Sequence, residues 1–132
     1  MHGLFKRKNR PAKEERPEDP GQNFIMKKIK TFAAKLKAGQ RFTRLLGDPS
    51  KKGLRAGLVT LKPGESIGEH KTEHKEEVIV ILNGSATIYY GKNKKIKAPK
   101  NTFAYIAPET PHNVKNSGSK ILQYVYVTAG VA

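Results

Sequence analysis

From Phe24 onward, the sequence consists of short apolar runs separated by glycine, proline, asparagine and aspartate. The breaks, such as Gly39, Asn83-Gly84 and Asn116-Ser-Gly118, recur about every eight to twelve residues. This spacing, with two-residue turn signals between alternating runs, is typical of an antiparallel sandwich or barrel. The sequence therefore predicts an all-β fold, with strands at residues 28–36, 41–46, 54–61, 77–82, 85–90, 94–98, 102–106, 113–116 and 121–128.

One of these strands has a competing interpretation. In residues 28–37, the apolar residues Ile29, Phe32, Ala33 and Leu36 also fall at helical spacing. We interpret the segment as a strand.

The first 23 residues differ from the rest of the chain. They contain Pro11, Pro17, Pro20 and clustered charges, with almost no periodic apolar pattern. We predict that residues 1–23 form a flexible, basic and polar N-terminal arm, and that residues 24–132 form one barrel domain. The arm is either a tail that aids solubility, an electrostatic tether, or a strand exchanged with a partner subunit.

Composition limits the chemistry. The chain has four histidines and no cysteine, so any metal must take imidazole and carboxylate ligands. No apolar run approaches the ~20 residues of a membrane span, and no signal peptide is recognisable. We therefore expect a cytoplasmic protein that does not contact membranes.

The net charge of +15 would attract anions of any kind, from small metabolites to nucleic acid. Of the 26 basic residues 20 are lysines, whereas base reading and bidentate phosphate recognition favour arginine. A specific nucleic-acid reader is therefore disfavoured, although electrostatic binding of nucleic acid or an acidic partner through the basic surface stays open.

Two segments carry candidate site residues at a distinctive spacing. The first runs from Gly64 to Gly84, and the second from Ile106 to Asn116. Their spacing resembles the two conserved motifs of the cupin superfamily. The matching positions are Gly64, His70, Thr72, Glu77 and Gly84 in the first motif and Pro108, His112 and Asn116 in the second, while Asn101 stands where a glycine is usual.

The resemblance implies a small single-domain cupin, an antiparallel double-stranded β-helix of the jelly-roll type. It also implies a divalent metal, an oxygen-rich small ligand, and dioxygenase, isomerase or lyase chemistry if the protein is an enzyme. Cupins commonly form dimers, so a homodimer is expected.

Side-chain alternation supports a metal site independently of the family. On a strand His70 and Thr72 point to the same side, and Glu77 shares its side with Ile79 and Ile81. We expect a hairpin between His70 and Glu77 to bring both toward one point, and His112 to enter from a later strand. Two imidazoles and one carboxylate with open positions suit iron(II), manganese, nickel or zinc.

Thr72 stands where the cupin motif has a second histidine, and a hydroxyl is a poor ligand for these metals. The only other histidine nearby is His74, which shares parity with His70. Two interpretations of His74 stay open: a fourth ligand that swings inward, or an exposed residue of a charged turn.

Two further alternatives stay open. One is a non-catalytic, metal-free binding module for a sugar or an anionic metabolite. The other concerns Arg41, Arg44 and Arg55, which precede or enter predicted strands; one that points inward would clamp a carboxylate or phosphate. The sequence does not choose among the three arginines.

Overall fold

The computed structural model describes residues 31–37, 39–48 and 53–131 of the chain. The chain divides into two units, Met1–Ala34 and Lys35–Ala132. Of the first unit only residues 31–34 are described, and they form neither helix nor strand. The predicted arm, residues 1–23, lies outside the described residues.

The described residues form strands and no helix, as the sequence predicts. They therefore contain no helix of the length and apolar character that would cross a membrane. In chain order the strands are β1 Phe42–Leu46, β2 Arg55–Leu61, β3 His70–Lys71, β4 Lys75–Asn83, β5 Ser85–Tyr90, β6 Lys94–Pro99, β7 Phe103–Ile106, β8 Pro111–Asn116 and β9 Leu122–Gly130.

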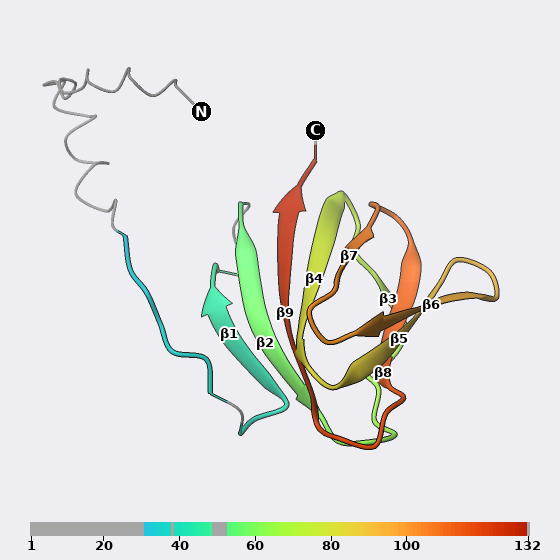
Figure 1. The fold of residues 1–132 in the computed structure, drawn as a ribbon. Coiled ribbons are helices and arrows are strands. Elements are labelled where there is room, and N and C mark those ends of the chain that lie inside the picture. The colour runs from blue at the N-terminus through green and yellow to red at the C-terminus, as the bar shows by residue number, and fades with distance from the viewer. Residues whose placement is uncertain (1–30, 38, 49–52, 132) are drawn as a thin grey trace, which may run out of the picture. The chain divides into compact units, whose positions relative to one another are not determined.

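The strands form two antiparallel sheets (Figure 1). Sheet A has the order β1-β2-β9-β4-β7, and sheet B has the order β3-β8-β5-β6. Chain segments alternate between the sheets, because β4 of sheet A lies between β3 and β5 in the sequence, and β7 of sheet A lies between β6 and β8. This is the predicted double-stranded β-helix, and it places residues from both sheets around one interior.

Alternation along each strand decides which side chains enter that interior. In β4, Glu77, Ile79 and Ile81 are all buried, as the sequence predicts. Each of these residues has a register partner on the neighbouring strand β9, and the partners also lie on the inner face of sheet A: Glu77 opposes Thr128, and Ile79 opposes Tyr126. Residues paired in this way form a row across the sheet. Each row therefore carries one side chain per strand into the barrel.

One end of the interior is closed by apolar packing. Leu61, Ile81 and Leu122 are at most 1% exposed and meet Ala86 of sheet B in a single core cluster. Burial of a side chain of this size stabilises the fold by about 1.5–3 kcal/mol. This end of the barrel holds the two sheets together.

Asn116 is a motif residue whose side chain is buried at the closed end. It is fully buried, and its Nδ2 donates to the carbonyl oxygens of Leu61 at 2.9 Å and Lys120 at 2.8 Å. Its Oδ1 accepts from the Gly118 amide at 3.0 Å. Because its side chain bridges three backbone groups, Asn116 has a structural role at the β8–β9 turn.

The structure corrects three local expectations. The segment 28–36 is not a strand where it is described, since residues 31–36 have no regular structure. Asn83-Gly84 does not close a hairpin, because β4 belongs to sheet A and β5 to sheet B. Gly84 has φ 81°, and a Cβ there would lie 2.5 Å from the Ile121 carbonyl oxygen, so the glycine permits a change of sheet.

The third correction concerns the site. His70 and Glu77 are not joined by a hairpin, since β3 pairs with β8 while β4 pairs with β7 and β9. The two residues approach each other across the barrel, from opposite sheets. Packing between the sheets therefore replaces the local pairing that the sequence indicates.

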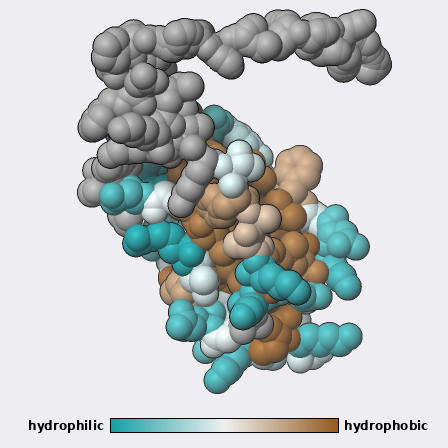
Figure 2. Space-filling model, turned by 90° about the vertical axis from the view of Figure 1, so that its left-hand side faces the viewer, coloured by the Kyte–Doolittle hydropathy of each residue, from teal (hydrophilic) through white to brown (hydrophobic). Residues whose placement is uncertain are grey.

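Hydrophobic residues also reach the outer surface. Figure 2 shows one side of the molecule, with hydrophobic residues gathered near its centre and hydrophilic residues around them. On the outer face of sheet A, Phe103 is 68% and Tyr105 53% exposed, and Val80 opposes Phe103 in the register.

Candidate metal centre

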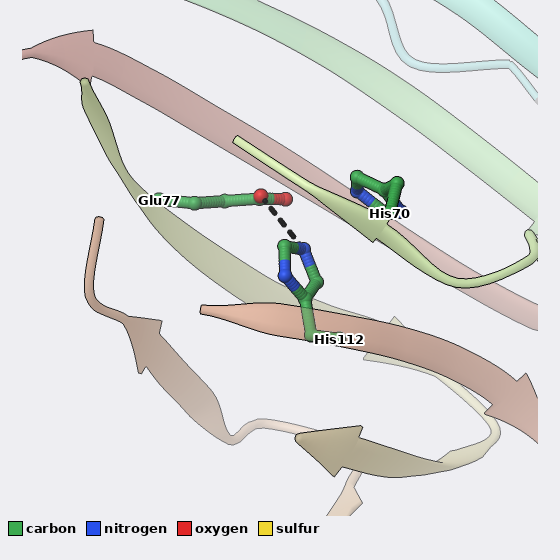
Figure 3. A group of neighbouring side chains, drawn as sticks. All are labelled: His70, Glu77 and His112. Atoms are coloured by element: carbon green, nitrogen blue, oxygen red, sulfur yellow. Dashed lines mark ion pairs between the residues drawn. The ribbon is translucent and has the colours of Figure 1, made fainter. Parts of the chain in front are cut away.

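The structure brings together three of the four predicted ligands. His70 comes from β3, Glu77 from β4 and His112 from β8, and one potential ligand atom of each lies within 4.8 Å of the others. Figure 3 shows Glu77 and His112 pointing at each other, with His70 beside them. The centre therefore joins two strands of sheet B to one of sheet A.

Strand pairing positions the two imidazoles. His70 and His112 are direct register partners in the β3–β8 ladder, so their side chains lie on the same face. Their ring centroids are 4.2 Å apart, and the ring planes are tilted by 59°. Two adjacent strands thus present two ring nitrogens to the same part of the interior.

Backbone carbonyls set the orientation and tautomer of both rings. His112 Nδ1 lies 2.8 Å from the Thr110 carbonyl oxygen, and His70 Nδ1 lies 3.2 Å from that of Gly68. Since a carbonyl only accepts, each Nδ1 carries the proton and donates. Each Nε2 is then left with a lone pair, the usual arrangement of metal-binding histidines.

The contact between Glu77 and His112 is the most informative one in the centre. Glu77 Oε1 lies 3.3 Å from His112 Nε2, and the side chains are 6% and 0% exposed. Neither atom has a hydrogen-bond partner of acceptable geometry among the described residues. Two buried lone-pair atoms facing each other require a cation between them, either a proton or a metal ion.

The electrostatics agree with this requirement. Burial alone would lower the pKa of His112, but the Glu77 carboxylate and the Thr110 carbonyl outweigh it and raise the pKa above its ordinary value. The site therefore favours positive charge at the position between Nε2 and Oε1.

Thr72 lies beside the three-residue centre. Its Oγ1 is buried without a hydrogen-bond partner among the described residues, and the residue lines the same cavity as His70 and Glu77. The position that has a histidine in the cupin motif thus carries an unpaired hydroxyl here, and the centre offers three strong ligands.

The structure does not bring His74 to the centre. Its side chain is 87% exposed, with Nδ1 3.5 Å from Glu109 Oε2. Its backbone has φ 58°, and its amide donates to the same carboxylate oxygen at 2.8 Å. The left-handed turn reverses the alternation after β3, so the parity shared with His70 no longer places His74 inside.

A cavity of about 410 Å³ opens onto the centre. Besides His70, Thr72 and Glu77, its lining includes Arg44 and Arg55, among further residues from β1, β2 and β9. This volume is within the usual range for small-molecule sites.

Two residues of β9, Tyr124 and Thr128, also line the cavity. Burial, with the nearby Glu77 carboxylate, raises the pKa of Tyr124, so its hydroxyl stays protonated. Thr128 was not predicted. Its signal was the alternation Tyr124, Tyr126, Thr128 along one strand, which places all three on the face that lines the cavity.

The fold is an antiparallel double-stranded β-helix, and two histidines and one glutamate cluster inside it at positions of the two cupin motifs. Residues 57–128 match the family model described as Cupin domain, which is more than half of the chain. The chain therefore belongs to the cupin domain family, which confirms the resemblance seen in its sequence.

Solved structures share this fold at low sequence identity. An RmlC-like cupin family protein from Methanocaldococcus jannaschii has a TM-score of 0.65 and 17% identity, covering 78% of this chain and 92% of that one. A predicted oxalate decarboxylase from Thermotoga maritima has a TM-score of 0.62 and 23% identity, covering 68% and 79%. These similarities support the fold.

A curated relative adds a sequence match of limited extent. Over 72 residues, 54% of this chain, the sequence is 28% identical to the mannose-1-phosphate guanylyltransferase RfbM of Salmonella typhimurium. The match spans only 15% of the length of that relative. It therefore concerns a cupin-sized part of the larger protein.

Proposed function

We propose that this protein binds one divalent metal ion through His70, Glu77 and His112 and holds an oxygen-rich small molecule in the adjoining cavity. The observation that carries the proposal is the pair of buried, unpartnered atoms, His112 Nε2 and Glu77 Oε1, 3.3 Å apart. A bound cation would satisfy both atoms, and it would also remove the desolvation cost of leaving them unpaired.

The donor set fits such an ion. Two neutral imidazoles and one carboxylate suit iron(II), manganese, nickel and zinc, and leave open positions for a ligand. When bound, the metal would supply Lewis-acid or oxygen-activating chemistry. Iron, manganese, nickel and zinc stay equal candidates, as do dioxygenase, isomerase and lyase reactions.

The residues of the chain would each have a defined task at this site. The Thr110 and Gly68 carbonyls hold the imidazoles in orientation. The apolar wall of the cavity, which includes Val59 and Ile67, limits the access of water. The protonated hydroxyl of Tyr124 would donate a hydrogen bond to a bound oxygen atom.

Metal content tests the proposal directly. Elemental analysis of protein purified without a histidine tag should find about one metal ion per chain in the wild type. We expect the metal to be lost in His70→Ala and His112→Ala. His74→Ala is the matched control, because it removes an exposed histidine outside the centre and should keep the metal.

The alternative is a metal-free binding module for a sugar or an anionic metabolite. Wild-type protein without metal, even after incubation with each candidate ion, would favour this alternative. Equal metal content in wild type and His112→Ala would show instead that the metal binds elsewhere on the chain.

Partners stay predictions. For a homodimer, the outer face of sheet A offers exposed Phe103 and Tyr105, and analytical ultracentrifugation would test it. For electrostatic binding of nucleic acid, Lys95 and Lys97 of β6 are exposed, and binding there should weaken steeply with salt.

A further inference from the structure

Three arginines were equivalent candidates in the sequence, and the structure separates them. Arg41 Nη1 lies 3.9 Å from Glu65 Oε2, and the same guanidinium group donates to the Ser66 carbonyl. These contacts tie Arg41 to the β2–β3 connection. Arg44 and Arg55 instead line the cavity beside the metal centre.

The strand register places these two arginines on the inner face of sheet A. Arg44 opposes Gly57, and Arg55 lies two residues before Gly57 on β2, so both share the face of Val59 and Leu61. They therefore enter the cavity because of strand alternation, from two neighbouring strands.

The same register gives their relation to the metal centre. Arg55 opposes Thr128 on β9, and Thr128 opposes Glu77 on β4, so one row runs from arginine to candidate ligand. With neighbouring strands ~4.8 Å apart, the backbones of Arg55 and Glu77 are separated by ~10 Å. The buried hydroxyl residue Thr128 is the only side chain between them in this row.

Gly57 leaves space on β2 for the ring of Tyr126, which lines the cavity. A Cβ at Gly57 would lie 2.5 Å from ring atoms and the hydroxyl of Tyr126, so the Tyr126 ring lies directly against the β2 backbone. Any larger residue at position 57 would push the ring away from β2. The glycine thus permits a flat aromatic wall next to the two arginines.

The two arginines of the lining, Arg44 and Arg55, have no carboxylate partner among the described residues. The acidic residues of the lining are Glu77, which faces His112, and Glu69, which is exposed. Two guanidinium groups in the lining of this cavity, of which Arg44 is exposed and Arg55 half-buried, therefore present ten N–H donors in all without a matching anion.

We infer that Arg44 and Arg55 form an oxyanion clamp, which binds a carboxylate or phosphate group of a small ligand. The planar guanidinium matches both groups with paired N–H···O bonds. The clamp itself needs only the two arginines. The further statement that the same ligand also reaches the metal rests on the proposed function. The other oxygen atoms of the ligand would then lie toward His70, Glu77 and His112, across the row that contains Thr128.

The test uses two probes that represent the two sources of oxyanion, malonate and inorganic phosphate. Isothermal titration calorimetry would measure each on metal-loaded full-length protein and on protein treated with a chelator. The variants are Arg44→Gln and Arg55→Gln. A third variant, Arg55→Lys, keeps the positive charge but lacks the planar guanidinium that makes paired hydrogen bonds. Lys95→Gln is the matched control, since it removes an exposed positive charge on the outer side of sheet B.

Loss of one charge-assisted contact should weaken probe binding by roughly 10- to 100-fold in each Gln variant. Arg55→Lys should recover part of the loss, and Lys95→Gln should bind like wild type. Preference for malonate would identify a carboxylate ligand, and preference for phosphate a phosphorylated one. Wild-type affinity in both Gln variants, or no binding of either probe to wild type at millimolar concentration, would overturn the clamp.

Metal analysis of the same samples separates the two proposals. If wild type lacks metal but binds a probe through Arg44 and Arg55, the clamp stands and the proposed metal function fails. If the metal is present in wild type and both Gln variants, with unchanged probe affinity, the clamp fails and the metal function stands.

Discussion

The two ends of the barrel interior differ in how their buried polar atoms are satisfied. At the closed end, Asn116 is fully buried and bonds three backbone groups. At the open end, Glu77 Oε1, His112 Nε2 and Thr72 Oγ1 are buried without a hydrogen-bond partner among the described residues. Strands β2, β4, β8 and β9 contribute to both ends.

This contrast separates structure from function. A buried polar atom without a partner costs about 1–3 kcal/mol, so three of them in one place are a considerable loss for a small domain. In the interior of the closed end, the buried side chain of Asn116 is satisfied by backbone groups, and only folding is at stake there. The fourth buried atom without a partner among the described residues, Thr60 Oγ1, belongs to the residue next to Leu61 and so to the opposite face of β2. We infer that the open end is built for something that binds there.

The largest expected effect on stability comes from a substitution in the apolar core of the closed end. Leu61→Ala removes a fully buried side chain from the core cluster and should lower the free energy of unfolding by about 2–5 kcal/mol, measured by urea denaturation. Metal bound per folded chain should stay the same. A variant as stable as wild type would show that the closed end does not hold the sheets together.

Metal addition should have the next largest effect, and it should act only through the open end. A ligand present at 100 times its dissociation constant stabilises the native state by about 2.7 kcal/mol. We expect the free energy of unfolding of the wild type to rise by about this amount when manganese, iron, nickel or zinc is added, as measured by thermal unfolding. His112→Ala should show no such rise, and an equal rise in that variant would place the stabilising ion elsewhere.

Thr72→Val should have the smallest effect, with the opposite sign to Leu61→Ala. The substitution keeps the shape and removes an unpartnered buried hydroxyl, so unfolding free energy should rise by about 1 kcal/mol. Metal content should not change, because the three remaining ligands are strong. A less stable variant would mean that the hydroxyl does have a partner, and lost metal would make Thr72 a ligand.

The sequence predicts correctly which side chains of β4 enter the interior, because the alternation of side chains along a strand alone decides this. Glu77, Ile79 and Ile81 point inward as predicted, because a strand of this length repeats every two residues. The motif spacing also placed His70 and His112 together, and the structure makes them register partners. These predictions needed only local pattern and the family resemblance.

What sequence could not predict depends on pairing between distant strands. The change of sheet at Gly84 looked like a hairpin, because its turn signal is the same in both cases. Arg41 and Arg44 could not be separated until the contacts of Arg41 with Glu65 were known. His74 has the parity of His70, but a left-handed turn directs it outward.

The most direct test is a crystal structure of the metal-incubated protein with anomalous diffraction measured at the metal edge. The account predicts one strong anomalous peak about 2.0–2.2 Å from both histidine nitrogens and a Glu77 oxygen. A site without a peak, in which His112 Nε2 and Glu77 Oε1 share a proton instead, would contradict it.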